Sequence, residues 1–175
     1  LSLAAGVEKD TDKGLALMRA SAKQGLSKAR STLGAVLLLG QAGVEKDIES
    51  GISLIRTATA QEEPKAQYML AQLYLAGRFG IDKDEDKGFK LMQHAADNGV
   101  PNAQERLAHA YFAGKFGVEK DIVKSYVWIV IAETNGDERS KQAKEFLKKR
   151  LTPEQLAKAE AMVKEMTEKN PRLLK

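Results

Sequence analysis

The chain carries few side chains from which a catalytic or metal-binding centre could be built. Its 175 residues include two histidines, His94 and His109, and no cysteine. Without cysteine the chain can form no disulfide, no thiolate zinc site and no cysteine nucleophile. The motifs HExxH, Ser-x-x-Lys and Gly-x-x-x-x-Gly-Lys, which serve zinc binding, acyl transfer and phosphate binding, are also missing. We therefore predict no catalytic site, no metal and no cofactor.

Recurring aspartates and glycines allow two further chemical interpretations. The aspartates Asp10, Asp47, Asp84 and Asp121 resemble calcium ligands, but they are spread one to each repeat of the sequence. Helix N-capping, in which a carboxylate accepts hydrogen bonds from free backbone N–H groups, accounts for them better. The glycines follow helix-forming segments rather than strands, which favours a turn over a nucleotide-binding loop.

The elements that would position any binding residue are set by an internal repeat. The pentapeptide Gly-Val-Glu-Lys-Asp begins at Gly6 and returns, once as a close variant, at Gly43, Gly80 and Gly117, always 37 residues later. A fixed period of this length indicates stacked helical units, each of which buries its apolar face against its neighbours. The sequence therefore predicts an all-α solenoid.

Each repeat divides into two helices, here called helix A and helix B. In one copy, helix A covers residues 66–76 and stops before Gly77, and helix B follows the capping Asp84 and ends at Asn98. Small residues recur where the helices must approach closely, namely Gly34, Ala71 and Ala108 in helix A and Gly14, Gly51, Gly88 and Ser125 in helix B. We expect a continuous core that contains Leu33, Leu37, Leu54, Leu70, Tyr74, Leu91, Leu107, Tyr111 and Trp128.

One copy of the repeat shows the pattern most fully, in Ala66, Leu70, Ala71, Tyr74, Gly77, Gly80, Ile81, Asp84, Lys87, Gly88, Ala95, Ala96 and Gly99. This pattern resembles the Sel-one-like repeat (SLR) family, a relative of the tetratricopeptide repeat. The resemblance implies a right-handed α/α superhelical solenoid of antiparallel helix pairs. The copy at Glu62 departs from it, because Glu62 stands where the other copies have Gly25, Gly99 and Gly136. We expect that turn to differ in shape.

The chain divides into a repeat region and a C-terminal segment. Residues 1–137 hold the repeats, and the first repeat is expected to be truncated because Leu1 aligns with Leu38, in the middle of helix A. Residues 138–175 indicate two more helices, the second with Thr152 as its N-cap. By resemblance to bacterial SLR proteins, we expect this pair to cap the last repeat.

Composition and charge narrow the classes of partner. The chain is 43% hydrophobic and 30% charged, and no apolar run approaches the ~18 to 20 residues that span a bilayer, so we expect no membrane insertion. The net charge of +4 arises in residues 138–175, which hold 11 Lys or Arg against 6 Asp or Glu. These cations alternate with an apolar seam that includes Phe146 and Leu147. This pattern indicates that the cations lie on the solvent-exposed face of an amphipathic helix. We therefore expect no nucleic-acid partner.

The resemblance to tetratricopeptide proteins implies a non-catalytic scaffold that binds a protein or peptide segment on a concave face formed by helix A. Since Leu33, Gly34 and Leu37 take the core side of helix A, the rotated face carries the residues at equivalent positions of three repeats. The predicted partner-binding residues are Ser31, Ala35, Leu38, Tyr68, Gln72, Leu75, Glu105, His109 and Phe112. Leu38, Leu75 and Phe112 have a second interpretation, in which they pack against neighbouring helices.

Two alternatives to a binding scaffold stay open at this point. Some SLR proteins have been discussed as enzymes of cell-wall or β-lactam chemistry, although those cysteine-rich members differ from this cysteine-free chain. A purely structural spacer is the other alternative. The resemblance slightly favours a bacterial periplasmic or secreted location over the cytoplasm. The sequence does not set the oligomeric state.

Overall fold

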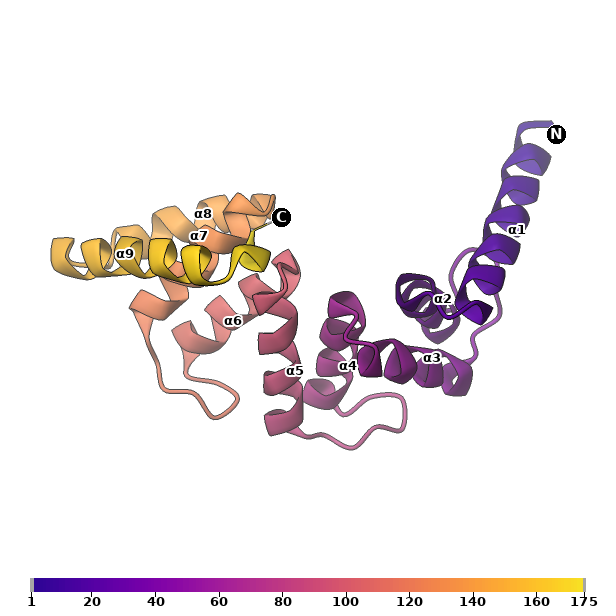
Figure 1. The fold of residues 1–175 in the computed structure, drawn as a ribbon, viewed down its shortest axis with the longest axis horizontal. Helices are drawn as coiled ribbons and strands as arrows, with labels where there is room; N and C mark the ends of the chain where they lie inside the picture. The colour runs from indigo at the N-terminus through magenta and orange to yellow at the C-terminus, as the bar shows by residue number, and fades with distance from the viewer. Residues whose placement is uncertain (1, 175) are drawn as a thin grey trace. The chain divides into compact units, whose positions relative to one another are not determined.

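The computed structural model describes residues 2–174 and the side chains of residues 11–174 (Figure 1). Within these residues the chain is helical and contains no strand, as the sequence predicted. The elements are α1 (Ser2–Lys23), α2 (Ser27–Leu39), α3 (Ile48–Ala60), α4 (Pro64–Ala76), α5 (Glu85–Asp97), α6 (Pro101–Ala113), α7 (Ile122–Thr134), α8 (Glu138–Lys148), α9 (Pro153–Lys169) and a short 3-10 helix, η1 (Pro171–Leu173). The even-numbered helices α2, α4 and α6 are the predicted A helices.

The chain forms two compact units, an N-terminal unit of residues 1–70 and a C-terminal unit of residues 71–175. In the N-terminal unit, α2 packs antiparallel on α3, so that Gly34 lies near Ile55 and Leu38 lies near Gly51. A Cβ built on Gly51 would lie 2.9 Å from the Gly34 carbonyl oxygen. The two backbones can approach this closely only because both positions are glycine.

The aspartates expected to cap the B helices do so in three repeats. The carboxylates of Asp47, Asp84 and Asp121 each accept a backbone hydrogen bond from the first turn of the following helix, at 2.9 to 3.0 Å. A hydrogen bond from the Lys87 side chain, together with one from its backbone N–H, lowers the pKa of Asp84. The capping interpretation of these aspartates is therefore confirmed.

The first repeat departs from the expected pattern. Residues 6–10 were expected to form a turn that ends in a cap at residue 10, but α1 continues through them without a break. The turn in later repeats begins at a left-handed glycine, such as Gly40 with φ 66° and Gly77 with φ 60°. The equivalent residue in the first repeat is Leu3, for which the left-handed conformation is unfavourable. The helical propensity of the neighbouring residues then prevails.

The turn at Glu62 also corrects an expectation, because it keeps the form of the others. Glu62 itself adopts the left-handed conformation with φ 58°. Its N–H donates to the carbonyl of Thr59 at 2.9 Å, as the N–H of Gly99 donates to that of Ala96 at 3.0 Å. Left-handed backbone costs roughly 1–2 kcal/mol for a residue other than glycine. Packing of the helices on either side outweighs that local cost.

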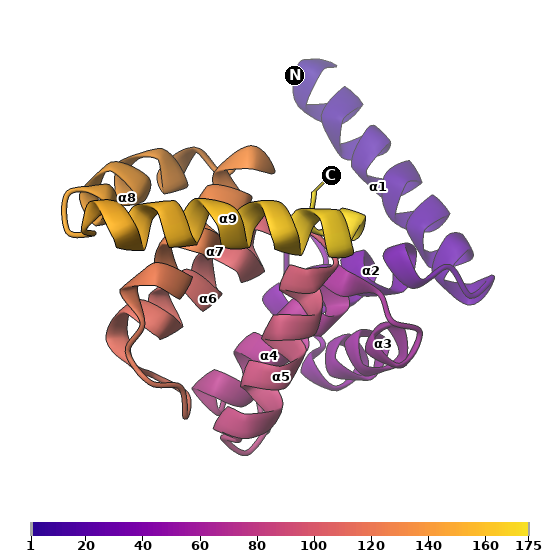
Figure 2. The same ribbon diagram turned by 60° about the vertical axis from the view of Figure 1, so that its left-hand side comes forward.

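In the C-terminal unit, α8 and α9 lie alongside α7 (Figures 1 and 2). A capping box starts α9, since Thr152 and Gln155 exchange side-chain and backbone hydrogen bonds. The chain then returns through η1, which buries Leu173. The carbonyl oxygen of Leu173 accepts hydrogen bonds from Gln104 Nε2 at 3.0 Å and Asn135 Nδ2 at 2.6 Å. The C-terminal segment is thereby fixed to α6 and α7.

The predicted core is correct at four of its nine positions. Leu33, Leu70, Leu107 and Trp128 are buried. The other five, Leu37, Leu54, Tyr74, Leu91 and Tyr111, are partly exposed. Helix A therefore buries a narrower stripe than the repeat pattern suggested.

Candidate functional site

The predicted binding residues of the N-terminal unit have unequal access to a ligand. Ser31 is buried and donates a hydrogen bond from its hydroxyl to the Lys28 carbonyl at 3.0 Å. Leu38 is 5% exposed, and its backbone lies against Gly51 of α3. Ala35 and Tyr68 are partly exposed. Of these four residues, Ala35 and Tyr68 are the ones that a partner could contact.

In the C-terminal unit, Leu75 packs on its own repeat, whereas Gln72 is exposed. A Cβ built on Gly88 would lie 2.6 Å from Leu75 Cγ, so the leucine covers the glycine of the paired helix. Leu75 and Leu38 thus follow the second interpretation given above, in which the apolar row packs between helices.

The third repeat brings Glu105, His109 and Phe112 to one face of α6. The His109 side chain is 67% exposed, and its Nε2 lies 3.2 Å from Glu105 Oε1. Phe112 is partly exposed and meets the ring of Phe146 of α8 edge to face, with 5.9 Å between ring centroids. A contact of this geometry is favourable between aromatic rings. It joins the predicted face of α6 to a helix outside the repeats.

An apolar hollow of about 240 Å³ lies at this junction of α6, α7 and α8. We call it the apolar hollow. It is lined by Ala108, His109, Phe112, Ser125, Ile129, Ala143, Phe146 and Leu147. Two of the predicted binding residues, His109 and Phe112, therefore lie at one hollow, and both come from the same helix.

Phe146 is the residue that sequence reasoning missed. It belongs to the apolar seam of α8 that was interpreted as packing, yet it is 44% exposed. Leu147, its neighbour, is buried against the rest of the unit. The signal available in the sequence was the period itself, because Phe146 lies 37 residues after His109 and therefore takes the same position of a helix A.

Cations surround the two rings. The Lys120 ammonium lies 5.6 Å from the centroid of the Phe112 ring, and the Arg150 guanidinium lies 3.5 Å from that of Phe146. On the outer side of α8, a shallow basic hollow of about 520 Å³ shares Phe146 with the apolar hollow. Its other lining residues are Lys141, Gln142, Glu145, Lys149 and Arg150.

A half-buried ion pair joins α7 to α8. Lys144 Nζ pairs with Glu133 Oε2 at 2.7 Å, and this hydrogen bond raises the pKa of Lys144. Burial raises the pKa of the Tyr126 hydroxyl. Among the described side chains, no cluster of three or more His, Cys, Asp or Glu is arranged to hold a metal ion. None of the described helices has the length and apolar character needed to cross a membrane.

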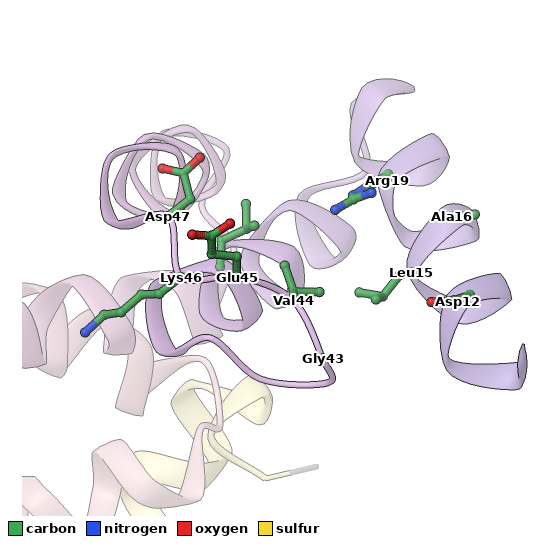
Figure 3. Close-up of a pocket in the computed structure, with 10 residues that line it drawn as sticks. Asp12, Leu15, Ala16, Arg19, Gly43, Val44, Glu45, Lys46 and Asp47 are labelled. Carbon is green, nitrogen blue, oxygen red and sulfur yellow. The ribbon is translucent and has the colours of Figure 1, made fainter. Parts of the chain in front are cut away.

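A third, larger hollow of about 780 Å³ lies in the N-terminal unit between α1 and the loop that joins α2 to α3 (Figure 3). Leu15 of α1 faces Val44 of the loop across it. Its rim carries both signs of charge, from Asp12, Arg19, Glu45, Lys46 and Asp47. The carboxylate of Asp47 is already engaged in capping α3. This mixed rim selects no charge in a ligand.

Together, the helix pairs, the repeated caps and the hollow on helix A define a helix-pair repeat protein of the tetratricopeptide-like class. The Sel1 repeat model matches residues 2–26, 28–62, 64–100 and 101–137. The chain belongs to the Sel1 repeat family, as the SLR resemblance indicated. Repeats of this family generally mediate protein–protein interactions, and its members are typically non-catalytic scaffolds.

Solved structures of SLR proteins are similar to this chain. One is c5321, a protective antigen of uropathogenic Escherichia coli strains with an SLR fold, which matches with a TM-score of 0.65 and 29% identity over 92% of this chain. The match covers 42% of the c5321 chain, so this chain spans about two fifths of its length. Another is a Sel1 repeat protein from Oxalobacter formigenes, with a TM-score of 0.65 and 33% identity over 76% of this chain and 98% of the other. The comparison with curated proteins gives no match.

Proposed function

We propose that the chain is a non-catalytic scaffold that binds a segment of a partner protein at the apolar hollow. The observation that carries this proposal is that two predicted helix A residues, His109 and Phe112, line a hollow whose mouth holds the exposed ring of Phe146. Phe146 is a large apolar side chain that is 44% exposed, so a partner that covers it lowers the free energy of the complex.

The size of the hollow supports a protein side chain as its occupant. Its volume of about 240 Å³ is smaller than the roughly 300–1,000 Å³ that small-molecule pockets occupy. One anchoring side chain, inserted from a peptide backbone that lies across α6 and α8, fits this size better than a whole small-molecule ligand. Anchors of this kind supply most of the binding energy in many protein interfaces.

Selection from a random peptide library, followed by affinity measurement on the purified chain, tests the proposal. We expect enriched peptides whose dissociation constants rise at least about tenfold with Phe146→Ala or His109→Ala, because both residues line the hollow. Leu39→Ala is the matched control, since Leu39 is an equally exposed apolar residue of helix A (53%) outside the hollow. It should leave the affinity unchanged.

Melting temperatures of the three variants separate binding from folding. His109 is an exposed side chain, so His109→Ala should melt as the native chain does. If no peptide is enriched, the spacer hypothesis is favoured. If enriched peptides bind all three variants equally, the chain binds them at a surface other than the apolar hollow.

A further inference from the structure

We infer that the partner segment is acidic and inserts one large apolar side chain into the apolar hollow, beside Phe112 and Phe146. This inference rests on the proposed function and names the chemistry of its partner. It follows from the charges near the apolar hollow, because those on α8 are mostly positive.

The charge around α8 is strongly positive. Residues 138–150 carry six Lys or Arg against two Glu. Three of these cations, Lys141, Lys149 and Arg150, line the basic hollow, and Glu145 is the single acidic residue among its lining side chains. A cationic rim attracts acidic segments and speeds their association.

Some of these cations are free to meet a partner. Glu138 pairs with Lys141 at 2.6 Å, and Glu133 pairs with Lys144 at 2.7 Å, so both lysines already have a carboxylate partner. Lys149, in contrast, forms no ion pair with any described residue. Lys120, above the Phe112 ring, also has none within residues 11–174.

These two lysines lie near different rings of the aromatic pair. Lys120 lies over Phe112, and Lys149 lines the basic hollow that adjoins Phe146. A ligand whose apolar side chain enters the apolar hollow therefore has Lys120 near Phe112 and the cations of the adjoining basic hollow near Phe146. Carboxylates on both sides of the anchor complement this arrangement.

The same combination of cations and aromatic rings does not suit nucleic acid. Single-stranded nucleic acid binds when its bases stack on free ring faces. Here Arg150 lies 3.5 Å from the Phe146 centroid, Lys120 lies over Phe112, and the two rings meet at an interplanar angle of 66°. The two rings line the apolar hollow and do not present free faces on which bases could stack. An apolar side chain can enter the cavity, whereas a base would have to displace a cation.

Three short synthetic peptides with a fluorescent label test the inference by fluorescence anisotropy. The first has a central Phe with Asp and Glu on both sides, the second has Lys and Arg in place of the acidic residues, and the third has Ala in place of Phe. We expect the first to bind at least about tenfold more tightly than either of the others, because it alone supplies both the anchor and the carboxylates. Its affinity should fall as NaCl is added.

The double variant Lys120→Glu/Lys149→Glu should weaken binding of the acidic peptide by about tenfold or more, because it reverses the charge on both sides of the anchor. The matched control is Lys90→Glu/Lys158→Glu, which makes the same change in net charge at exposed lysines of α5 and α9. It should retain the affinity of the native chain. Both double variants should keep the native melting temperature.

Several outcomes would overturn the inference, namely equal binding of the three peptides, equal loss of affinity in the two double variants, or tight binding of single-stranded DNA instead. Peptide-library selection distinguishes this failure from failure of the proposed function. If selected peptides lack acidic residues and still lose affinity with Phe146→Ala, the hollow binds a segment of another chemistry. If no selected peptide depends on Phe146, the proposed function itself has failed.

Discussion

At the scale of single residues, the large hollow of the N-terminal unit has a simple cause. Its lining includes Leu15 and Leu37, which occupy the repeat positions of Phe89 and Tyr111. In the C-terminal unit those two rings meet edge to face, with 6.4 Å between their centroids. Two leucines at the same positions fill less space than two rings, which favours a hollow at the place shown in Figure 3.

Leu37→Tyr should therefore raise the melting temperature. The substitution gives this repeat the tyrosine that Tyr111 provides elsewhere, and such cavity-filling changes commonly stabilise by about 0.5–2 kcal/mol. Thermal unfolding followed by circular dichroism measures the effect. Leu39→Tyr, at an exposed neighbouring position, should bring no gain. A melting temperature lowered by Leu37→Tyr would show that the hollow has no room for the ring.

Residue-scale features divide into those that the sequence could predict and those that it could not. The caps at Asp47, Asp84 and Asp121 were predictable because a cap depends on the next few residues alone. The left-handed conformation of Glu62 and Phe79 was not predicted, because helix packing imposes it against the local preference.

At the scale of elements, small residues decide how closely paired helices approach. Gly14 and Gly51 occupy the same position of helix B, 37 residues apart, but their surroundings differ. A Cβ on Gly51 would lie 2.9 Å from the backbone of α2, at Gly34 O and Leu38 N. A Cβ on Gly14 would meet nothing within 4 Å. Packing therefore requires glycine at Gly51 but not at Gly14.

The two alanine variants should therefore change stability in opposite directions. Gly51→Ala should destabilise by about 1–3 kcal/mol, because the added methyl group forces the paired helices apart. Gly14→Ala should stabilise by up to about 1 kcal/mol, because alanine favours the helical backbone more than glycine does. Chemical denaturation of both variants measures the difference. A gain in both would mean that α3 can shift away from α2 at little cost.

The contact between α6 and α8 was the hardest feature of the fold to predict. The helix pairs themselves follow from the 37-residue spacing, and the family match confirms the repeats. The pairing of Phe112 with Phe146 joins the last matched repeat to α8, which begins 37 residues after α6 and so takes the position of a further helix A. Periodicity placed His109 and Phe112 on one face and, continued past residue 137, would also have placed Phe146 at the repeat position of His109.

At the scale of the whole molecule, each repeat contacts chiefly its neighbours, so stability is a sum of local terms. In the C-terminal unit, the end of the chain also packs back on earlier helices. Leu173 is 2% exposed, and its carbonyl oxygen accepts hydrogen bonds from Gln104 and Asn135. Asn170 Nδ2 adds a hydrogen bond to the Asp97 carbonyl at 2.8 Å. These bonds connect the end of the chain to residues of α5, α6 and α7.

Leu173→Ala should consequently weaken one part of the molecule and spare the other. Truncation of a buried leucine costs about 2–5 kcal/mol, and in a repeat protein this cost falls on the elements next to the cavity. Hydrogen–deuterium exchange should become faster in α5, α6 and α7, while α2 and α3 keep their native rates. Leu174→Ala is the control, because Leu174 is 38% exposed and should change neither set. If Leu173→Ala raises exchange equally throughout residues 11–174, the chain unfolds as one cooperative body, and the local account of its stability is wrong.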